Sequence, residues 1–324
     1  MKKIIWVLLD DRMGSVGQAK GILQEMSEDF DIIEKKIVYN KFAKLPNFLR
    51  GRFFLLGVDK SKSDDLKGCP DIVLSISRRT TPIALWIKRR SKGKTKIVQL
   101  MFSGKYGLKD IDLLVMPEHD RGKTSSDNAF YIVGCPHRIN EATLQNAKEQ
   151  WQDVFSKLPR PLTAVLVGGA IKNKPFSNEN AKKLADEIVN IHQKVSGSVL
   201  ITTSRRTGES AQSIIMEKIK DIPTYTFLWG EKKENPILGF YACADRIIAT
   251  GDSVSMVCEA CGSGKDVMIF EGKHWLTKKH LAFVKSLVDN GYAVRIDNEN
   301  AVDFIPQKKL HNSLDVAKKI ESLV

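Results

Sequence analysis

The chain has 324 residues, of which 42% are hydrophobic and 27% charged, a composition typical of a globular protein and a length that suits two ordinary domains. Its apolar runs, such as residues 4–9, are much shorter than the roughly 20 apolar residues that a membrane-spanning helix needs, which excludes that class. The formal net charge is +13, with 29 Lys and Arg against 19 Asp and Glu in residues 1–160 and 22 against 19 in residues 161–324. A basic first half favours an anionic partner: nucleic acid, a membrane surface or a phosphorylated small molecule.

Strand-like and amphipathic helix-like runs alternate through the first half of the chain. This alternation predicts a parallel sheet covered by helices. The expected strands are residues 4–9, 32–38, 71–76, 96–101, 111–116 and 130–133, and the expected helices are residues 16–26, 81–90 and 142–155.

Pro159 and Pro161 then interrupt the helical pattern and mark a linker, after which the alternation starts again. The expected strands of this second half are residues 163–169, 198–203, 224–229, 245–250 and 267–270, and its helices include residues 178–195, 253–262 and 277–290. We therefore predict an α/β protein of two doubly wound, Rossmann-like domains, residues 1–158 and 159–324, facing a cleft. A last helix, from residue 312, either stays in the second domain or packs back on the first.

The expected location is the cytoplasm. Met1-Lys2-Lys3 runs directly into the first strand, which predicts no cleavable leader, and five cysteines without a disulfide-like spacing fit a reducing compartment. A peripheral position on the inner face of a membrane stays open, because residues 41–60 mix Phe and Leu with Lys and Arg as headgroup-binding segments do. The alternative for residues 41–60 is a solvated helix over a loop.

Open parallel sheets bind ligands at the carboxyl ends of their strands, so the loops that follow strands carry the expected chemistry. The loop after the first strand is glycine-rich but lacks the G-x-G-x-x-G spacing of dinucleotide sites. In the second half, Gly168 and Gly169 follow a strand, where the absence of side chains lets a phosphate or the opposing domain approach. A tight turn without a ligand explains the pair equally well.

The segment from Ile247 to Phe270 carries the most specific signal. A strand ends at Thr250, and Asp252 or Ser253 is expected to cap a helix whose N-H groups and dipole can hold a phosphate. Glu259 lies about two turns further along, roughly 9 to 10 Å by the helical rise, where a carboxylate can accept both ribose hydroxyls. Cys258 and Cys261 have half the spacing of a metal site, but no second pair follows, so we assign them to the core.

The four residues SRRT occur twice, as Ser77 to Thr80 and as Ser204 to Thr207, each time after an apolar strand. Arginines at such a strand end bind phosphate or carboxylate well. We predict that Arg205 and Arg206 meet donor phosphates, and that Arg78 and Arg79 meet an anionic acceptor or the opposing domain. The alternative is that the arginines pair with nearby acidic residues.

Several of these stretches together resemble the mitochondrial fission "elongated mitochondria" family, over residues 5 to about 270. They are IWVLLDDRMGSVGQAKGI, CPDIVLSISRRTTP, MPEHD, GCPHR, TTSRRT, NPILGFYACAD and TGDSVSMVCEACGSGKDV. That family in turn resembles the GT-B glycosyltransferases, in which a Gly-Gly turn and a helix start hold the donor diphosphate. A glutamate five residues before a glycine holds the ribose, and Glu259 and Gly264 have that spacing. Asp266 departs from the pattern, because the superfamily usually has proline there.

The resemblance implies three sets of site residues. For the catalytic base, the superfamily often has a histidine after the first strand where this chain has Gly14-Ser15, so the expected base is Asp11, His119 or Asp120, with His137 a further alternative. The donor-binding residues are expected to be Gly168, Gly169, Ser204, Arg205, Arg206, Ser253, Ser255, Met256 and Glu259. The acceptor-binding residues are expected to be Gly14, Ser15, Gln18, Arg78, Arg79 and His137.

Two functions follow from the resemblance. The first is a nucleotide-sugar-binding protein that acts as a glycosyltransferase on an anionic or lipid-linked acceptor, by direct transfer without a metal or other cofactor. The second is a non-catalytic, membrane-associated adaptor with a protein partner. Nucleic acid is not an expected partner, because the basic stretches lack the aromatic platforms of nucleic-acid readers.

Overall fold

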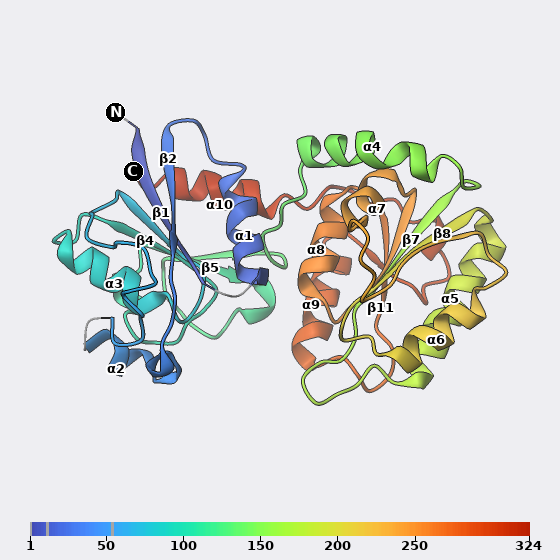
Figure 1. Ribbon diagram of the computed structural model, residues 1–324, viewed down its shortest axis with the longest axis horizontal. Helices are drawn as coiled ribbons and strands as arrows, with labels where there is room; N and C mark the ends of the chain where they lie inside the picture. Colours follow the sequence, from blue (N-terminus) through green and yellow to red (C-terminus); the bar gives the residue numbers. More distant parts are fainter. Residues whose placement is uncertain (1, 11–12, 53–54) are drawn as a thin grey trace. The chain divides into compact units, whose positions relative to one another are not determined.

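A computed structural model describes residues 2–10, 13–52 and 55–324, and the chain divides into two compact units (Figure 1). The first unit comprises residues 1–138 and 312–324, and the second residues 139–311. Each unit is built on a six-stranded, wholly parallel sheet, so the prediction of two parallel α/β domains is confirmed. In the part of the chain that the structure describes, no helix has the length and apolar character needed to cross a bilayer.

The first sheet has the strand order β2-β1-β3-β4-β5-β6. Its elements are β1 (Lys3–Leu9), α1 (Met13–Leu23), β2 (Phe30–Lys36), α2 (Asn47–Arg52), β3 (Ile72–Ser75), α3 (Thr81–Arg90), β4 (Lys96–Leu100), β5 (Leu113–Pro117), β6 (Ala129–Ile132) and α10 (Asn312–Glu321), with short 3-10 turns at Lys41–Lys44, Leu108–Asp110 and Glu118–Asp120.

Alternate side chains of the first sheet enter two separate cores. Ile5 and Val7 of β1 pack with α1 and α10 on one face, whereas Trp6 and Leu8 pack with α3 on the other. This is the period of two that a strand imposes, and a sheet covered on both faces needs apolar residues at nearly every position. Figure 1 shows α10 beside α1, so the C-terminal helix closes one of the cores of the first unit.

The second sheet has the order β12-β11-β10-β7-β8-β9. Its unit contains α4 (Glu141–Phe155), β7 (Leu162–Val167), α5 (Asn178–Val195), β8 (Ser198–Thr203), α6 (Glu209–Lys218), β9 (Thr224–Phe227), α7 (Ile237–Cys243), β10 (Arg246–Thr250), α8 (Val254–Gly262), β11 (Asp266–Phe270), α9 (Lys278–Asp289), β12 (Val294–Arg295) and a 3-10 turn at Ala301–Asp303.

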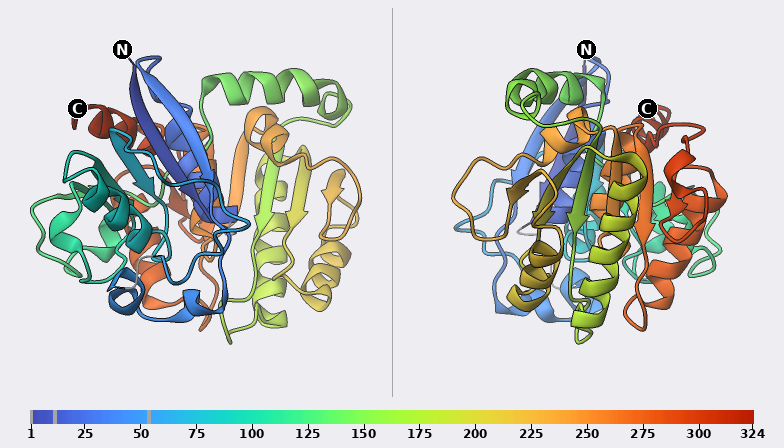
Figure 2. Two further views of the ribbon diagram at one scale, coloured as in Figure 1. Left: turned by 60° about the vertical axis from the view of Figure 1, so that its left-hand side comes forward. Right: turned by 90° about the vertical axis from the view of Figure 1, so that its right-hand side faces the viewer.

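The helix α4 belongs to the second unit, although the proline linker that we expected to separate the domains follows it. The reason is aromatic packing: the Phe155 ring lies 5.2 Å from Tyr225 of β9 and 5.7 Å from Phe240 of α7. Gly239 permits the close approach of α7 to α4, because a Cβ there would lie 2.5 Å from the Trp151 ring. Elsewhere in this unit α5 and α6 pack side by side (Figure 2).

The first residues of α10 are fixed by buried polar contacts. The Asn312 amide donates to the carbonyls of Val133 and Cys135, the latter at 3.2 Å, and the Ser313 hydroxyl lies 2.6 Å from the His137 carbonyl. Asn312 and Ser313 are 3% and 4% exposed, so these carbonyls have little access to water. The contacts hold the return of the chain to the first unit.

We predict that Asn312→Ala lowers the free energy of unfolding by about 2 kcal/mol, because it removes the donor from two buried carbonyls. Urea unfolding followed by tryptophan fluorescence and circular dichroism measures the change. His311→Ala, at the exposed neighbouring position, serves as the control and should change the stability by less than about 0.5 kcal/mol. Equal stability of Asn312→Ala and wild type would contradict the assignment.

Candidate functional site

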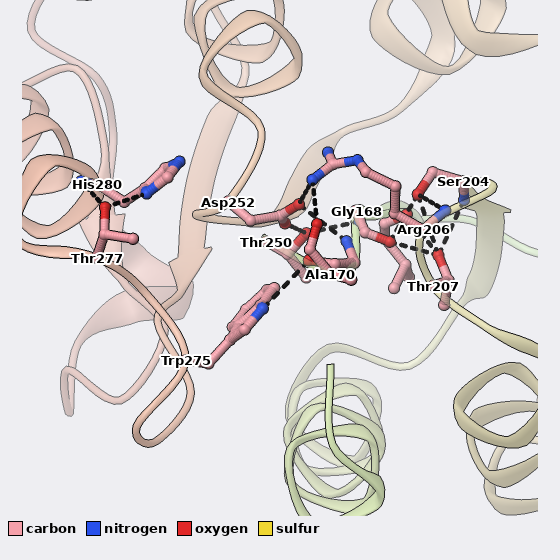
Figure 3. A network of polar contacts seen from close by, with 12 residues as sticks. Gly168, Ala170, Ser204, Arg206, Thr207, Thr250, Asp252, Trp275, Thr277 and His280 are labelled. Atoms are coloured by element: carbon pink, nitrogen blue, oxygen red, sulfur yellow. Dashed lines mark hydrogen bonds and ion pairs between the residues drawn. The ribbon is translucent and has the colours of Figure 1, made fainter. Parts of the chain in front are cut away.

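Three loops at the carboxyl edge of the second sheet are tied together by one buried carboxylate, that of Asp252. Its Oδ2 accepts from the Gly169 N-H at 2.9 Å and lies 2.9 Å from Arg206 Nη1, and its Oδ1 lies 2.8 Å from the Thr250 hydroxyl. The side chain is fully buried. Figure 3 shows Arg206 reaching from the turn after β8 to Asp252, so the loops after β7, β8 and β10 meet at this group.

Burial dominates the electrostatics of this network. It raises the pKa of Asp252, and the Gly169 N-H, the Thr250 hydroxyl and the Arg206 guanidinium oppose the shift without cancelling it. Burial also lowers the pKa of His280 on α9, against the raising effect of nearby Asp252. The His280 ring is oriented by the Thr277 hydroxyl, 2.7 Å from Nδ1.

Gly168 and Gly169 owe their small size to contacts within the second unit. A Cβ at Gly168 would lie 2.1 Å from the Asp252 carboxylate, and one at Gly169 would lie 2.0 Å from the Arg206 backbone. The N-H groups of Gly168, Gly169 and Ala170 donate to Thr250 Oγ1, Asp252 Oδ2 and the Arg206 carbonyl. These three backbone N-H groups are therefore bonded within the protein, and the loop forms the floor of the site.

The two SRRT motifs form the same turn. In each, the serine hydroxyl accepts from the N-H of the second arginine at 3.2 Å, and the threonine hydroxyl accepts from the serine N-H at 3.0 Å. In each, the second arginine then pairs with an aspartate after a strand of the same sheet: Arg79 with Asp10 at 3.2 Å, and Arg206 with Asp252 at 2.9 Å. The acidic partner that sequence reasoning offered as the alternative is thus present for both second arginines.

The strands that precede these turns are not equivalent. The first turn follows β3, which separates β1 from β4, whereas the second follows β8, which separates β7 from β9. The two turns therefore follow strands in different positions of their sheets. SRRT repeats a local turn structure and does not mark the same position in two duplicated domains. The Ser and Thr hydroxyls of Ser-x-x-Thr close a compact turn at the end of the strand, and the second arginine links this turn to the loop that carries the aspartate.

A pocket of about 400 Å³ opens at the carboxyl ends of β7, β8 and β9, entirely within the second unit. Arg205 and Met256 lie on its wall, with Phe227 and the 61% exposed Trp229. The backbone N-H of Trp229 donates to Thr203 Oγ1 at 2.9 Å, which fixes the loop that carries the indole. The volume suits a small ligand, and the aromatic side chains offer planar surfaces for a ring.

Glu259 lies one helical turn beyond Met256 on α8 and is half-buried. The hydroxyl of buried Tyr241, on α7, lies 3.1 Å from Glu259 Oε2 and 3.3 Å from the Met256 carbonyl. Burial and the charge of Glu259 raise the pKa of Tyr241 well above its ordinary value, so the hydroxyl stays protonated and donates. The carboxylate is therefore oriented by a buried donor, which an exposed helix glutamate would not need.

The expected helix cap differs in detail. Ser253 is the N-cap residue of α8, but its side chain makes no capping hydrogen bond, and the Asp252 carboxylate turns to Gly169 and Arg206 instead. Ser255 and Met256 lie in the first turn of the helix. The first N-H groups of an α-helix have no partner within the helix, which makes this end suitable for an anion.

The predicted residues of the first unit are more dispersed. Gly14, Ser15 and Gln18 lie on α1, and Arg78 and Arg79 follow β3. His119 and Asp120 lie in the 3-10 turn after β5, where Asp120 is buried and 2.6 Å from Lys123 Nζ. His137 is buried, and its backbone holds Ser313 of α10. Asp11 lies outside the described residues.

Sequence reasoning missed three residues of the second-unit network: Asp252 as a bridge between loops, Thr250, and Tyr241. An acid two residues after a buried strand was a usable signal for Asp252. Tyr241 gave none, because it lies in an apolar run that is typical of core. Cys258 and Cys261 are buried as predicted, and the described residues hold no cluster of three His, Cys, Asp or Glu that could bind a metal.

A family model described as "Mitochondrial fission ELM1" matches residues 13–323. The chain belongs to this family. The mitochondrial fission protein ELM1 of Arabidopsis thaliana is 30% identical, over 69% of this chain and 57% of that protein, so the match spans less than two thirds of its length. An uncharacterized protein of Rickettsia prowazekii is 28% identical, over 99% of this chain and 97% of its own length.

Solved structures with the same fold cover nearly the whole ELM1-family chain. The UDP-GlcNAc 2-epimerase of Methanocaldococcus jannaschii has a TM-score of 0.60 and 16% identity, over 99% of this chain and 100% of that one. MurG of Acinetobacter baumannii has a TM-score of 0.53 and 12% identity, over 99% of both chains. At these identities the similarity shows the fold, and the predicted GT-B-like class of two Rossmann-like domains is confirmed.

The network around Asp252 gives a prediction about stability. We expect a double-mutant cycle of Arg206→Gln and Asp252→Asn, measured by urea unfolding, to give a coupling free energy of about 1 kcal/mol, because one partner is fully buried and the other is partly exposed. The exposed pair Lys285 and Asp289 on α9 is the control, with an expected coupling of about 0.3 kcal/mol. Equal coupling in the two pairs would show that burial adds nothing at Asp252.

Proposed function

We propose that the second unit binds a nucleoside diphosphate sugar, and that the protein is a GT-B-like glycosyltransferase acting on an anionic or lipid-linked acceptor. The observation that carries this proposal is the pocket beside the first turn of α8, with Glu259 held by Tyr241 one turn away. In the proposed complex the base lies between Phe227 and Trp229, and the ribose hydroxyls donate to Glu259. The phosphates lie at the start of α8, around Ser253 and Ser255.

Charge and fold support the proposed donor site. Arg205 is exposed on the pocket wall and can reach a phosphate, while Arg206 holds the floor of the site through Asp252. The similar structures include a UDP-GlcNAc 2-epimerase, whose name specifies a nucleotide sugar. A helix N-terminus and a guanidinium stabilise the charge of a departing diphosphate without a metal.

In the proposed reaction the acceptor hydroxyl loses its proton to a base, its oxygen bonds to the anomeric carbon, and the bond from that carbon to the diphosphate oxygen breaks. The nucleoside diphosphate leaves with the electron pair of that bond. Asp11, His119 and Asp120 of the first unit are the proposed bases. General base catalysis of this kind contributes about 10² to 10⁴ in rate.

We predict that a nucleoside diphosphate raises the melting temperature of the wild type and that Glu259→Ala weakens its binding by about tenfold or more, because two ribose hydroxyls lose a charged acceptor. Tyr241→Phe should weaken binding less, since the carboxylate remains but loses its orienting donor. Thermal shift and calorimetry with a panel of nucleoside diphosphates and nucleotide sugars measure both effects.

The control for this panel is Glu217→Ala, which removes an exposed glutamate on α6. It should bind like the wild type. If no nucleotide stabilises the wild type, the proposed transferase function is wrong.

A second function, as a membrane-associated adaptor, is favoured by an exposed aromatic pair in the first unit. Phe42 and Phe48 are 41% and 57% exposed, and Lys41 and Lys44 flank Phe42, with the Lys41 ammonium 5.5 Å from the Phe42 ring. Exposed phenylalanines beside lysines suit an anionic lipid surface. The fission name of the Arabidopsis relative motivates the same proposal for this chain.

For this second function we predict that Phe42→Ser with Phe48→Ser lowers co-sedimentation with anionic phospholipid vesicles at least several-fold, because two large apolar side chains no longer enter the lipid. Ile305→Ser is the control, since Ile305 is 78% exposed in the other unit. Equal vesicle binding by the double variant and the wild type would contradict the proposed membrane contact at this surface.

A further inference from the structure

The first unit contains an arginine, Arg50 of α2, that is only 2% exposed. Arginine is almost never fully buried unless it is paired. Arg50 Nη2 donates to the Arg79 carbonyl at 2.9 Å, but Nε and Nη1 are buried without a hydrogen-bond partner, and no carboxylate of the described residues lies within ion-pair distance. Burial of a charged group whose donors make no hydrogen bond lowers the free energy of unfolding, so we expect Arg50 to have a functional role.

The surroundings of Arg50 add positive charge. Burial lowers the pKa of its guanidinium, and the charges of Arg78 and Arg79 lower it further. The ring of Tyr39 lies near two of these cations, 5.8 Å from Arg50 Cζ and 4.4 Å from Arg79 Cζ. Asp10 pairs with Arg79 at 3.2 Å, and among the described residues no carboxylate forms an ion pair with Arg50 or with the exposed Arg78.

A buried acceptor without a hydrogen-bond partner belongs to Asn47, on the same helix as Arg50. Asn47 is 6% exposed and one helical turn before Arg50. Its Nδ2 donates to the Arg78 carbonyl at 3.0 Å, whereas its Oδ1 is buried without a partner. The side chains of Asn47 and Arg50 thus donate to consecutive backbone carbonyls of one SRRT turn. Each side chain also has buried polar atoms without a hydrogen-bond partner.

One side of the Arg50 guanidinium is closed. A Cβ at Gly57 would lie 2.7 Å from Nε, so the backbone of the following loop packs directly against that atom. Nη1, which is also buried and has no hydrogen-bond partner, is therefore the donor that we assign to a ligand. Guanidinium groups bind phosphate oxygens in fixed, often bidentate geometry. A phosphate monoester has a second pKa of about 6, and its singly protonated form carries one P-OH group that can donate to an amide oxygen.

We propose that Asn47, Arg50, Arg78 and Arg79 form a binding site for a phosphate monoester in the first unit. Arg78 meets the ligand at the surface, Arg79 and Arg50 hold its oxygens, and Asn47 Oδ1 accepts from the P-OH group of the monoanion. This site is separate from the nucleotide site of the second unit and does not depend on it. Its ligand is either a soluble phosphate ester or the phosphate of a lipid headgroup, which share this chemistry.

The test uses the guanidinium N-H signals of the full-length, isotopically labelled protein in nuclear magnetic resonance, assigned with Arg50→Gln. Inorganic phosphate and glycerol 3-phosphate are titrated at constant ionic strength against chloride. We expect a saturable shift of the Arg50 Nη-H signals, because Nη1 is the donor assigned to the ligand, and calorimetry should show at least about tenfold weaker phosphate-ester binding by Arg50→Gln. Arg90→Gln removes an arginine that packs on Trp86 in the same unit, and it should bind like the wild type.

A second arm identifies the source of the phosphate, by vesicle binding with phosphatidylcholine alone and with phosphatidic acid added. Arg50-dependent binding to the acidic vesicles supports a lipid headgroup, and Arg50-dependent binding of glycerol 3-phosphate alone supports a soluble ester. If Arg50→Gln does not fold, Arg78→Gln at the exposed position replaces it, with a several-fold loss expected. An Arg50 signal that neither ligand nor vesicles move, or variants that lose stability without losing phosphate affinity, would overturn the proposal.

Discussion

A buried carboxylate must be paired, and at Asp252 this requirement organises the carboxyl edge of the second sheet. Asp252 takes one donor from the loop after β7, one from the last residue of β10 and one from the turn after β8. Gly168 and Gly169 are there because Asp252 and Arg206 approach them so closely. These loops lead into α8 and contribute to the pocket wall, so the positions of that wall and of Glu259 depend on the contacts of Asp252.

The first unit uses the same turn with a different result. There the second arginine of SRRT also pairs with an aspartate, but α2 adds Arg50 and Asn47 against the carbonyls of the turn. In the second unit the charges within the network nearly balance, which suits a floor beneath a ligand. In the first unit, no carboxylate of the described residues forms an ion pair with Arg50 or Arg78, which suits a site that binds an anion itself.

Sequence periodicity was sufficient for the two parallel sheets, because buried parallel strands and amphipathic helices leave unmistakable patterns. The two SRRT motifs follow β3 and β8, as the pattern predicted, and Glu259 lies on the helix that follows β10. Sequence could not supply the partners: Arg206 and Asp252 are far apart in the chain, and the donor to Glu259 is a tyrosine inside an apolar helix. Nor could it show that α4 joins the second unit through aromatic packing, or that Arg50 is buried. Such contacts depend on which elements meet in three dimensions.

The proposed function depends on the pocket beside α8 binding a nucleotide sugar, with Glu259 as the ribose ligand. A crystal structure of the protein with a nucleoside diphosphate would show whether it does. We expect ribose hydroxyls within hydrogen-bond distance of the Glu259 carboxylate, phosphate oxygens at the first N-H groups of α8, and the base beside Trp229. A nucleotide bound elsewhere, with Glu259 still held only by the protein, would contradict the proposed function.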